Sequence, residues 1–412
     1  MGLEHERQRI LDFVATESLR ILPELGSLQQ ERRSAKPFVA VAHSVFEVLR
    51  NSLASRLDLL VSTVGKVNPQ LASERLSLIY IGVERTLSLI AAVAVSQKDI
   101  ARELECIVDW FFKRCTAFAP PPTYILHVGT QLATLDFRFL LTTLFVPLGR
   151  RDIFPELTSR FAANDLFIIH VPGSMALATG SINWPLVFHE CVHAIELRAN
   201  IVASHFPTLP VDRALLKHQA KNGDTLAIEA LQAQELLCDA IAVYVSGPAF
   251  VWRFLRLYFW IIGIVHPSYS HPRVDLRMER LIAALRQRGF QEEAEKARAM
   301  LDDLLRDLKG SAMPAASAST AADAAQSSYE TALEALTSKR FEDVLASRFD
   351  KRKEDLRRDL LEKRPVVADP GTLFTLVAFQ TDCEDTAISE RLADFIRLDA
   401  IATRFAELGL SG

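Results

Sequence analysis

Residues 184–197 read WPLVFHECVHAIEL and contain His189, Glu190 and His193 in the order H-E-x-x-H. On a helix, side chains four residues apart lie one above the other on the same face, so both imidazoles can reach one metal ion. Glu190 follows the first histidine directly and would project beside the metal, where a general base is needed. The stretch therefore predicts a helix that carries two zinc ligands and a catalytic carboxylate.

The residues around this motif predict that its helix is buried. They are uncharged, namely Val187, Phe188, Cys191, Val192, Ala194 and Ile195. Short motifs also occur by chance, and two histidines with a glutamate can simply line a solvent-exposed face. A buried His-Glu-His group, however, is tolerable only with a partner for its polar atoms, and a metal ion is the partner that we expect.

A catalytic zinc site needs three protein ligands and an open position for water. A motif continuing as H-E-x-x-H-x-x-G-x-x-H would require glycine at 196 and histidine at 199, but these positions hold Glu196 and Ala199. The metzincin pattern is therefore excluded. The third ligand has to come from another segment.

Residues 225–246 predict a second helix, capped by Asp224 and ended by Gly247 and Pro248. Glu235 and Asp239 lie four apart on it and share one face. Glu235 can bind the metal while Asp239 accepts the N–H of a ligating imidazole. The competing third ligands are Glu196, on the first helix, and Glu229, which has no acidic residue one turn later.

Three blocks together resemble the gluzincin metallopeptidases of the CAAX prenyl protease and HtpX heat-shock protease group. The blocks are HECVH from His189, ELLCDAIAV from Glu235 and SHPRVDLRMERL from Ser270. They match H-E-x-x-H, E-x-x-(A)-D and H-P-x-x-x-x-R-x-x-x-L in the family's order, over roughly residues 165–285. In the last block the pattern falls on His271, Pro272, Arg277 and Leu281. Cys238 stands where the family has alanine.

The resemblance implies a zinc-dependent endopeptidase with one zinc ion per chain and a peptide or protein substrate. Glu190 would deprotonate a zinc-activated water for attack on a peptide carbonyl and then pass the proton to the leaving amine. His271 and Arg277 would be candidates for stabilising the oxyanion. In the alternative interpretation, Arg277 pairs with a structural carboxylate and His271 caps a helix. Weaker candidates for the same role are Tyr244, Tyr258, His266 and Tyr269.

A function of another class also fits the sequence. The first 120 and the last 100 residues have no counterpart in the resemblance, so the chain could be a catalytically silent or latent zincin-fold interaction or regulatory module. Its helical flanks would then bind a regulatory partner. The intact Glu190 argues against a degenerate enzyme.

The fold that we expect is mainly α with a small antiparallel β-sheet, an α+β class with a zincin-like metallopeptidase core flanked by helical regions. Residues 1–119 predict a helical domain with boundaries at Pro23, Pro37 and Pro69. Residues 120–307 would form the metallopeptidase domain, 308–328 an Ala/Ser-rich linker and 329–412 a helical C-terminal region. Strands are expected at residues 123–128, 137–146, 166–171 and 175–179. Residues 166–171 would be the edge strand that pairs with an extended peptide substrate.

The composition of the chain limits the partners and the cellular location that we expect for it. The net charge of −4 over 412 residues gives no reason to expect nucleic acid. The five cysteines are scattered without a C-x-x-C pair, which favours a reducing, cytoplasmic location, with Cys191 and Cys238 as small buried side chains. The apolar runs 76–95 and 250–265 carry internal charges, so no membrane span is expected. The N-terminus lacks the pattern of a secretory signal.

Overall fold

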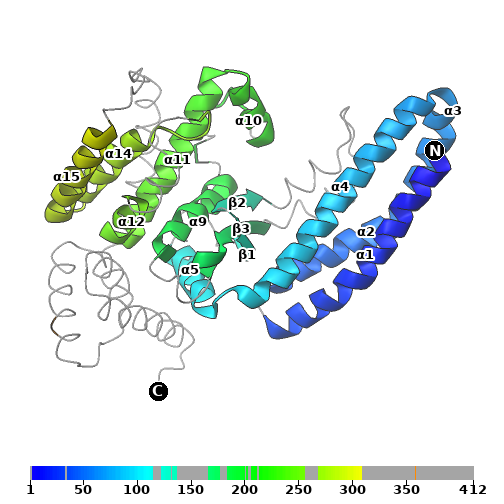
Figure 1. Cartoon of the computed structure of the whole chain (residues 1–412), viewed down its shortest axis with the longest axis horizontal. Coiled ribbons are helices and arrows are strands. Elements are labelled where there is room, and N and C mark those ends of the chain that lie inside the picture. Colours follow the sequence, from blue (N-terminus) through cyan, green and yellow to red (C-terminus); the bar gives the residue numbers. More distant parts are fainter. Residues whose placement is uncertain are drawn as a thin grey trace. The chain divides into compact units, whose positions relative to one another are not determined.

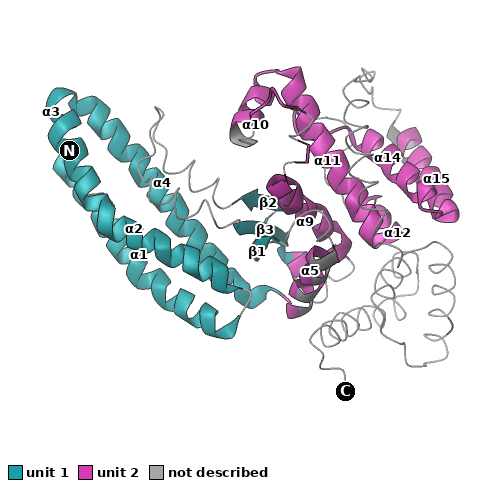
Figure 2. Cartoon of the chain, turned by 180° about the vertical axis from the view of Figure 1, so that it is seen from behind, with its two compact units in different colours: residues 1–100, 122–173 teal, residues 101–121, 174–412 magenta. Residues whose placement is uncertain are grey.

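The computed structural model describes residues 2–32, 35–114, 122–130, 132–136, 166–176, 183–199, 201–202, 206–210, 213–255, 268–308 and 358. The expected strand at 137–146, the Ala/Ser-rich linker from residue 309 and nearly all of the expected C-terminal region lie outside these residues. The chain forms two compact units, residues 1–100 with 122–173 and residues 101–121 with 174–412 (Figure 2). The strands therefore belong to the same unit as the N-terminal helices.

The first unit contains three long helices. They are α1 (Leu3–Glu31), α2 (Lys36–Leu59) and α4 (Pro69–Ser96), with a π-helical turn at Leu60–Val64, a single turn α3 (Gly65–Val67) and a 3-10 turn at Gln97–Asp99 (Figure 1). Helix α1 packs against both α2 and α4. Helix α2 buries one apolar stripe, formed by Val45, Val48, Leu49, Leu53 and Leu57.

The predicted helix boundaries are confirmed at two of three prolines. Pro37 lies in the first turn of α2, and Asn68 caps α4, where its side chain accepts a hydrogen bond from the N–H of Leu71 at 3.0 Å. The boundary expected at Pro23 is wrong, since α1 continues through it. Pro23 is exposed, so water can replace the hydrogen bond that a proline removes from a helix.

The described strands form a three-stranded sheet in the order β1-β3-β2. Strand β1 (Thr123–Gly129) pairs parallel with β3 (Leu166–Pro172), with His127 opposite His170, and β2 (Ala133–Asp136) pairs antiparallel with β3. The α+β class is confirmed, but the sheet is mixed rather than antiparallel. Strand β3 is central, so the expectation that it is an edge strand open to a peptide is wrong.

A further expected strand is replaced by helix at its start. Met175 and Ala176 belong to the short helix α8 (Gly173–Ala176), and residues 177–179 lie outside the description. The carbonyl of Ala176 accepts the N–H of Ala101 at 2.7 Å, and that of Met175 accepts the indole N–H of Trp184 at 3.0 Å. Both carbonyls thus bind partners outside the described sheet, as expected for residues that belong to a helical turn.

The second unit is helical in its described part. Its elements are α5 (Arg102–Arg114), α9 (Trp184–Ala199), α10 (Arg213–Lys221), α11 (Thr225–Ser246), α12 (Pro248–Arg253), α14 (Val274–Gln287) and α15 (Gln291–Leu308) (Figure 1). Helix α9 packs against α11, α5 and α12, and α11 also packs against α14. The ring of Phe111 on α5 stacks on that of Phe188 on α9 with centroids 4.8 Å apart. Helix α9 is thus enclosed by other helices.

One helical segment of the described chain, Pro69–Asp99, is long and apolar enough to cross a membrane. Its most apolar window has a mean hydropathy of 1.8, and half of that window is buried within the protein. Core helices of globular proteins have the same properties, so the segment is weak evidence for a membrane span.

Candidate metal centre

Helix α9 places the H-E-x-x-H motif in the interior, as its sequence predicted. Every side chain from Trp184 to Glu196 is buried, and His189 and His193 are each 4% exposed. The helix begins at Trp184, with Pro185 in its first turn, where the missing N–H of proline costs no hydrogen bond. The two imidazoles lie one helical turn apart and face the same side.

Helix α11 supplies the facing carboxylates. It is capped by Asp224, whose side chain accepts the N–H groups of Leu226 and Ala227, and it ends at Gly247, where φ is +58°. A side chain would strain the backbone at that conformation, so glycine fits the end of the helix. Both Glu235 and Asp239 are buried on this helix.

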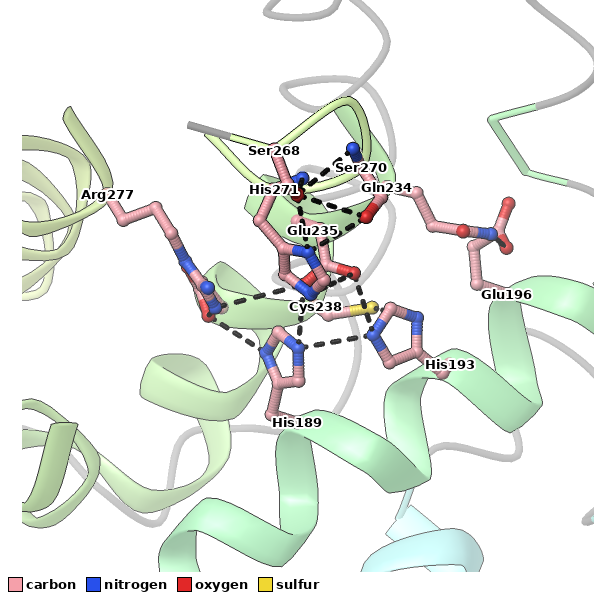
Figure 3. Close-up of polar contacts among 11 residues, drawn as sticks. His189, His193, Glu196, Gln234, Glu235, Cys238, Ser268, Ser270, His271 and Arg277 are labelled. Carbon is pink, nitrogen blue, oxygen red and sulfur yellow. Dashed lines mark hydrogen bonds and ion pairs between the residues drawn. The ribbon is translucent and has the colours of Figure 1, made fainter. Parts of the chain in front are cut away.

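Three side chains converge on one point. Nε2 of His189 lies 3.2 Å from Nε2 of His193 and 3.2 Å from Oε2 of Glu235, and Nε2 of His193 lies 3.3 Å from Oε1 of Glu235 (Figure 3). At such distances two ring nitrogens either share a hydrogen-bonded proton or bind a common cation, and two imidazoles with a carboxylate are a donor set found at metal sites. The donor set therefore fits a metal ion.

Asp239 determines which nitrogen of His189 faces the centre. Its Oδ1 lies 2.8 Å from Nδ1 of His189, although the contact is bent and Nδ1 has no partner with straight hydrogen-bond geometry. A proton on Nδ1 faces this carboxylate, which leaves the lone pair on Nε2 for a metal. Asp239 thus lies where the sequence predicted the group that orients a ligating imidazole.

Arg277 on α14 holds Asp239 from the other side. Its Nε and Nη2 donate to Oδ2 and Oδ1 of Asp239, each at 2.7 Å, while Nη2 lies 3.9 Å from Oε2 of Glu235. The guanidinium is 2% exposed and lies over the ring of Phe254, 4.8 Å from its centroid. These contacts favour the interpretation in which Arg277 pairs with a structural carboxylate.

The protein groups create a negative field at the centre. Burial lowers the pKa of His189, but the carboxylates of Asp239 and Glu235 outweigh burial and raise that pKa to about 10. Burial likewise raises the pKa of Glu235, but the two imidazoles outweigh it and hold that pKa well below its usual range. A field that stabilises a proton on a buried imidazole also stabilises a metal cation.

Glu190 belongs to the same buried group. Its carboxylate and the ring nitrogens of His189 and His193 lie within 4.8 Å of one another, and these three residues could hold a metal ion. The carboxylates of Glu190, Glu235 and Asp239 carry three formal negative charges, and the guanidinium of Arg277 beside Asp239 and Glu235 carries one positive charge. A divalent cation would balance this excess of negative charge.

Two other glutamates, Glu196 and Glu229, competed with Glu235 as the third ligand. Glu196 accepts hydrogen bonds from the side chain of Gln234 and from the N–H of Val202. It therefore ties α9 to α11 and to the following turn instead of facing the two histidines. Glu229 lies six residues before Glu235, which places it on a different face of α11.

His271 lies beside the converging ligands, in the loop that precedes α14. Its Nε2 is 3.6 Å from Oε1 of Glu235, and its side chain is half-exposed. Burial lowers the pKa of His271 below its ordinary value, so the ring is neutral at neutral pH. Among the weaker oxyanion candidates, Tyr244 lies under the guanidinium of Arg288 and Tyr269 near Lys221, whereas Tyr258 and His266 lie outside the described residues.

No family model, no curated protein and no solved structure matches the chain.

The resemblance to gluzincin peptidases therefore rests on the three sequence motifs alone, and the structure adds where the residues of these motifs lie. What the structure establishes is a buried His189-Glu190-His193 group able to hold a metal ion, faced by Glu235.

Sequence reasoning missed three contacts at this centre. Sγ of Cys238 lies 3.3 Å from Nδ1 of His193, and the hydroxyls of Ser268 and Ser270 lie 3.1 and 2.9 Å from Nδ1 of His271. Cysteine at position 238 departs from the alanine of the family pattern, and this departure could have indicated the contact with His193. The two serines precede His271 by three residues and by one, but their spacing alone does not indicate a shared partner.

Proposed function

We propose that the chain is a zinc-dependent endopeptidase of gluzincin type. The observation that carries the proposal is the convergence of two imidazoles and a carboxylate, His189, His193 and Glu235, with a second carboxylate, Glu190, in the same buried group. Two imidazoles and one carboxylate from a following helix are the ligand set of one class of zinc peptidases. The family resemblance of the three sequence blocks supports the same assignment.

The roles of the two carboxylates follow from their contacts. Glu235 contacts both imidazoles directly, so we assign it as the third ligand. Glu190 is next to a ligand in sequence and shares the buried group of the two histidines, which suits a group that accepts a proton from a metal-bound water. When bound, zinc supplies a Lewis acid that polarises a carbonyl and makes water more acidic at neutral pH.

The remaining residues of the proposed site orient a metal ligand or donate a hydrogen bond to the substrate. Asp239, held by Arg277, keeps the ring of His189 in one tautomer and one orientation. His271 faces the centre and is the better placed of the two oxyanion candidates, because the guanidinium of Arg277 is engaged by Asp239. The substrate class that we propose is a peptide or protein.

Metal content and turnover test the proposal together. The purified full chain should contain about one zinc per chain, and it should cleave members of an unbiased peptide library. A zinc chelator should abolish cleavage, and added zinc should restore it. A chain that holds zinc but cleaves nothing would instead support the interaction-module alternative, and a metal-free chain at neutral pH would contradict both.

A further inference from the structure

Helix α4 in the first unit is apolar on both of its sides. Its inner side belongs to the hydrophobic core of that unit and buries four aliphatic side chains, those of Leu76, Val83, Leu87 and Ile90. Its outer side also carries aliphatic side chains, with Leu71 36%, Ile81 40% and Val95 51% exposed. A helix that is apolar all round is normally buried, so the outer side of α4 has the character of a surface that a partner covers.

One stripe along the outer side recurs at alternating intervals of three and four residues. This outer stripe consists of Leu71, Glu74, Leu78, Ile81, Arg85, Ser88, Ala92 and Val95. All of these residues are exposed except Leu78, which is half-buried. The alternation is that of the a and d positions of a coiled coil, which keeps one stripe of side chains facing a neighbouring helix. Because five of the eight residues are apolar, the outer stripe has the pattern of a helix–helix contact.

Two residues of opposite charge interrupt the outer stripe. Glu74 and Arg85 are both exposed and lie eleven positions apart, which is about 16 Å along the helix axis. That separation is too long for an ion pair within one helix. A second copy of α4 that runs antiparallel to the first would bring Glu74 of each chain opposite Arg85 of the other.

The register set by this ion pair also matches apolar side chains. It places Leu78 of one chain opposite Ile81 of the second copy, and Leu71 opposite Ser88. Each pair occurs twice, because a two-fold axis relates the two chains. The centre of the contact is then formed by four aliphatic side chains, with an ion pair on each side of them.

Other registers of the same two helices are less favourable. A shift of one copy by seven residues would place Glu74 opposite Leu78 or opposite Ala92 of the second copy. Either arrangement desolvates a carboxylate against an apolar side chain, which costs free energy without a compensating partner. The charges of the outer stripe therefore select one register.

A lipid bilayer is the other partner that an apolar helix suggests. The segment Pro69–Asp99 has the length and hydropathy of a membrane span, but its outer side carries Glu74, Glu84 and Arg85. Charged side chains are costly in the hydrocarbon of a bilayer. Between two copies of α4, by contrast, Glu74 and Arg85 neutralise one another. The charges thus favour a second copy of the chain over a membrane.

We propose that the outer stripe of α4 is a homodimer interface, in which α4 helices of two chains pack antiparallel with Glu74 of each chain paired to Arg85 of the other. Such a contact uses the same surface of both chains and closes about a two-fold axis. The inference goes beyond the proposed function and does not rest on it, since the stripe shares no residue with the metal centre.

The mass of the full chain in solution tests the dimer. Sedimentation equilibrium between about 1 and 100 µM should show a monomer–dimer equilibrium with a Kd in roughly the micromolar range. Ile81→Gln places a polar group at the apolar centre of the contact and should raise this Kd at least about tenfold. Leu19→Gln, at a leucine of α1 that is 81% exposed, is the matched control and should dimerise like the wild type. A wild-type chain that stays monomeric throughout this range would overturn the proposal.

Charge reversal tests the register. Glu74→Arg or Arg85→Glu alone turns two attractions into two repulsions and should raise the Kd of the dimer at least about tenfold. The double variant E74R/R85E restores opposite charges, so its Kd should return to within about threefold of the wild type. Both positions are exposed, so the fold should be kept, which circular dichroism checks. A double variant that dimerises no better than the single variants would overturn the pairing.

Vesicle binding separates the second copy from a lipid surface. The wild-type chain should remain in the supernatant when vesicles of phosphatidylcholine and phosphatidylserine are sedimented. A monomeric chain that binds these vesicles, and loses that binding in Ile81→Gln, would assign the outer stripe to a membrane and overturn the proposal. A dimer whose Kd is unchanged by Ile81→Gln and by both charge reversals would place the interface elsewhere and overturn it as well.

Discussion

Oδ1 of Asp239 lies 2.8 Å from Nδ1 of His189, and the same carboxylate accepts two hydrogen bonds from Arg277. A chain of contacts thus runs from α14 through α11 to the first histidine of the motif. Burial raises the pKa of Asp239, but Arg277 and His189 outweigh it and hold that pKa below its usual value. Asp239 therefore stays ionised and faces Nδ1 of His189, which suits the role that we propose for it in orienting that imidazole.

Replacing Asp239 by asparagine should weaken zinc binding. The substitution keeps the size of the side chain but removes the charge that holds the N–H of His189, and loss of such a partner typically costs 10- to 100-fold in affinity, so we expect about that range. Zinc affinity is measured by competition with a chelator. Glu229→Gln, on a different face of the same helix, is the control and should bind zinc like the wild type. Equal affinities for the asparagine variant and the wild type would remove Asp239 from the metal centre.

Removing the guanidinium of Arg277 should destabilise the fold. Arg277→Ala leaves the buried carboxylate of Asp239 without its partner, which costs about 3–5 kcal/mol in the free energy of unfolding. Arg273→Ala serves as the matched control, because Arg273 pairs with Asp275 near the surface and such pairs are worth at most about 1 kcal/mol. Chemical denaturation of the full chain measures both. A stable Arg277→Ala protein with a lowered kcat would instead support a role of Arg277 at the oxyanion.

Replacing Cys238 should weaken zinc binding less than replacing Asp239. Burial raises the pKa of Cys238 well above its ordinary value, so the group beside Nδ1 of His193 is a neutral thiol, a weak hydrogen-bond partner. Cys238→Ala should weaken zinc binding by less than about tenfold. Cys191→Ala, on the helix of the histidines, should leave zinc affinity unchanged. A loss for Cys238→Ala as large as that for Asp239→Asn would show that the thiol is a major orienting group.

His127 in the first unit should make stability depend on pH. Burial, and then the nearby charge of His170, lower the pKa of His127 to about 4. The unfolded chain, with a pKa of about 6.5, binds more protons between these values, so the free energy of unfolding falls by up to about 3 kcal/mol as pH drops from 6.5 to 4. Above pH 6.5 this contribution to the pH dependence disappears.

The variant His127→Gln tests whether His127 causes this loss of stability at low pH. Denaturation at pH 7 and pH 4.5 should show a smaller loss of stability for the variant than for the wild type, because glutamine does not titrate. His5→Gln, at an exposed position on α1, should keep the wild-type pH dependence. Identical losses for His127→Gln and the wild type would contradict the assignment.

Local patterns predicted the elements that carry the metal centre. Helices α9 and α11 were expected because apolar runs with capping residues, such as Asp224, are properties of the local sequence. The four-residue spacing then fixed which side chains share a face. The structure brings His189, His193, Glu235 and Asp239 together as that spacing indicated.

The sheet could not be predicted in the same way. Strand β2 has four residues, too few for a pattern, and the direction in which β1 and β3 pair depends on segments distant in sequence. The contact of Cys238 with His193 is likewise tertiary, because it depends on how α11 packs against α9. Pro23 shows the reverse case, in which a strong local signal is overridden because its position is exposed.

Glu190→Gln tests the central claim most directly. The variant keeps the size and burial of the side chain but cannot accept a proton, so it should still hold about one zinc per chain while its kcat on a cleaved peptide falls by at least about 10²-fold. Glu229→Gln, measured in parallel, should cleave like the wild type. Zinc-loaded Glu190→Gln protein that cleaves the peptide at the wild-type rate would contradict the account.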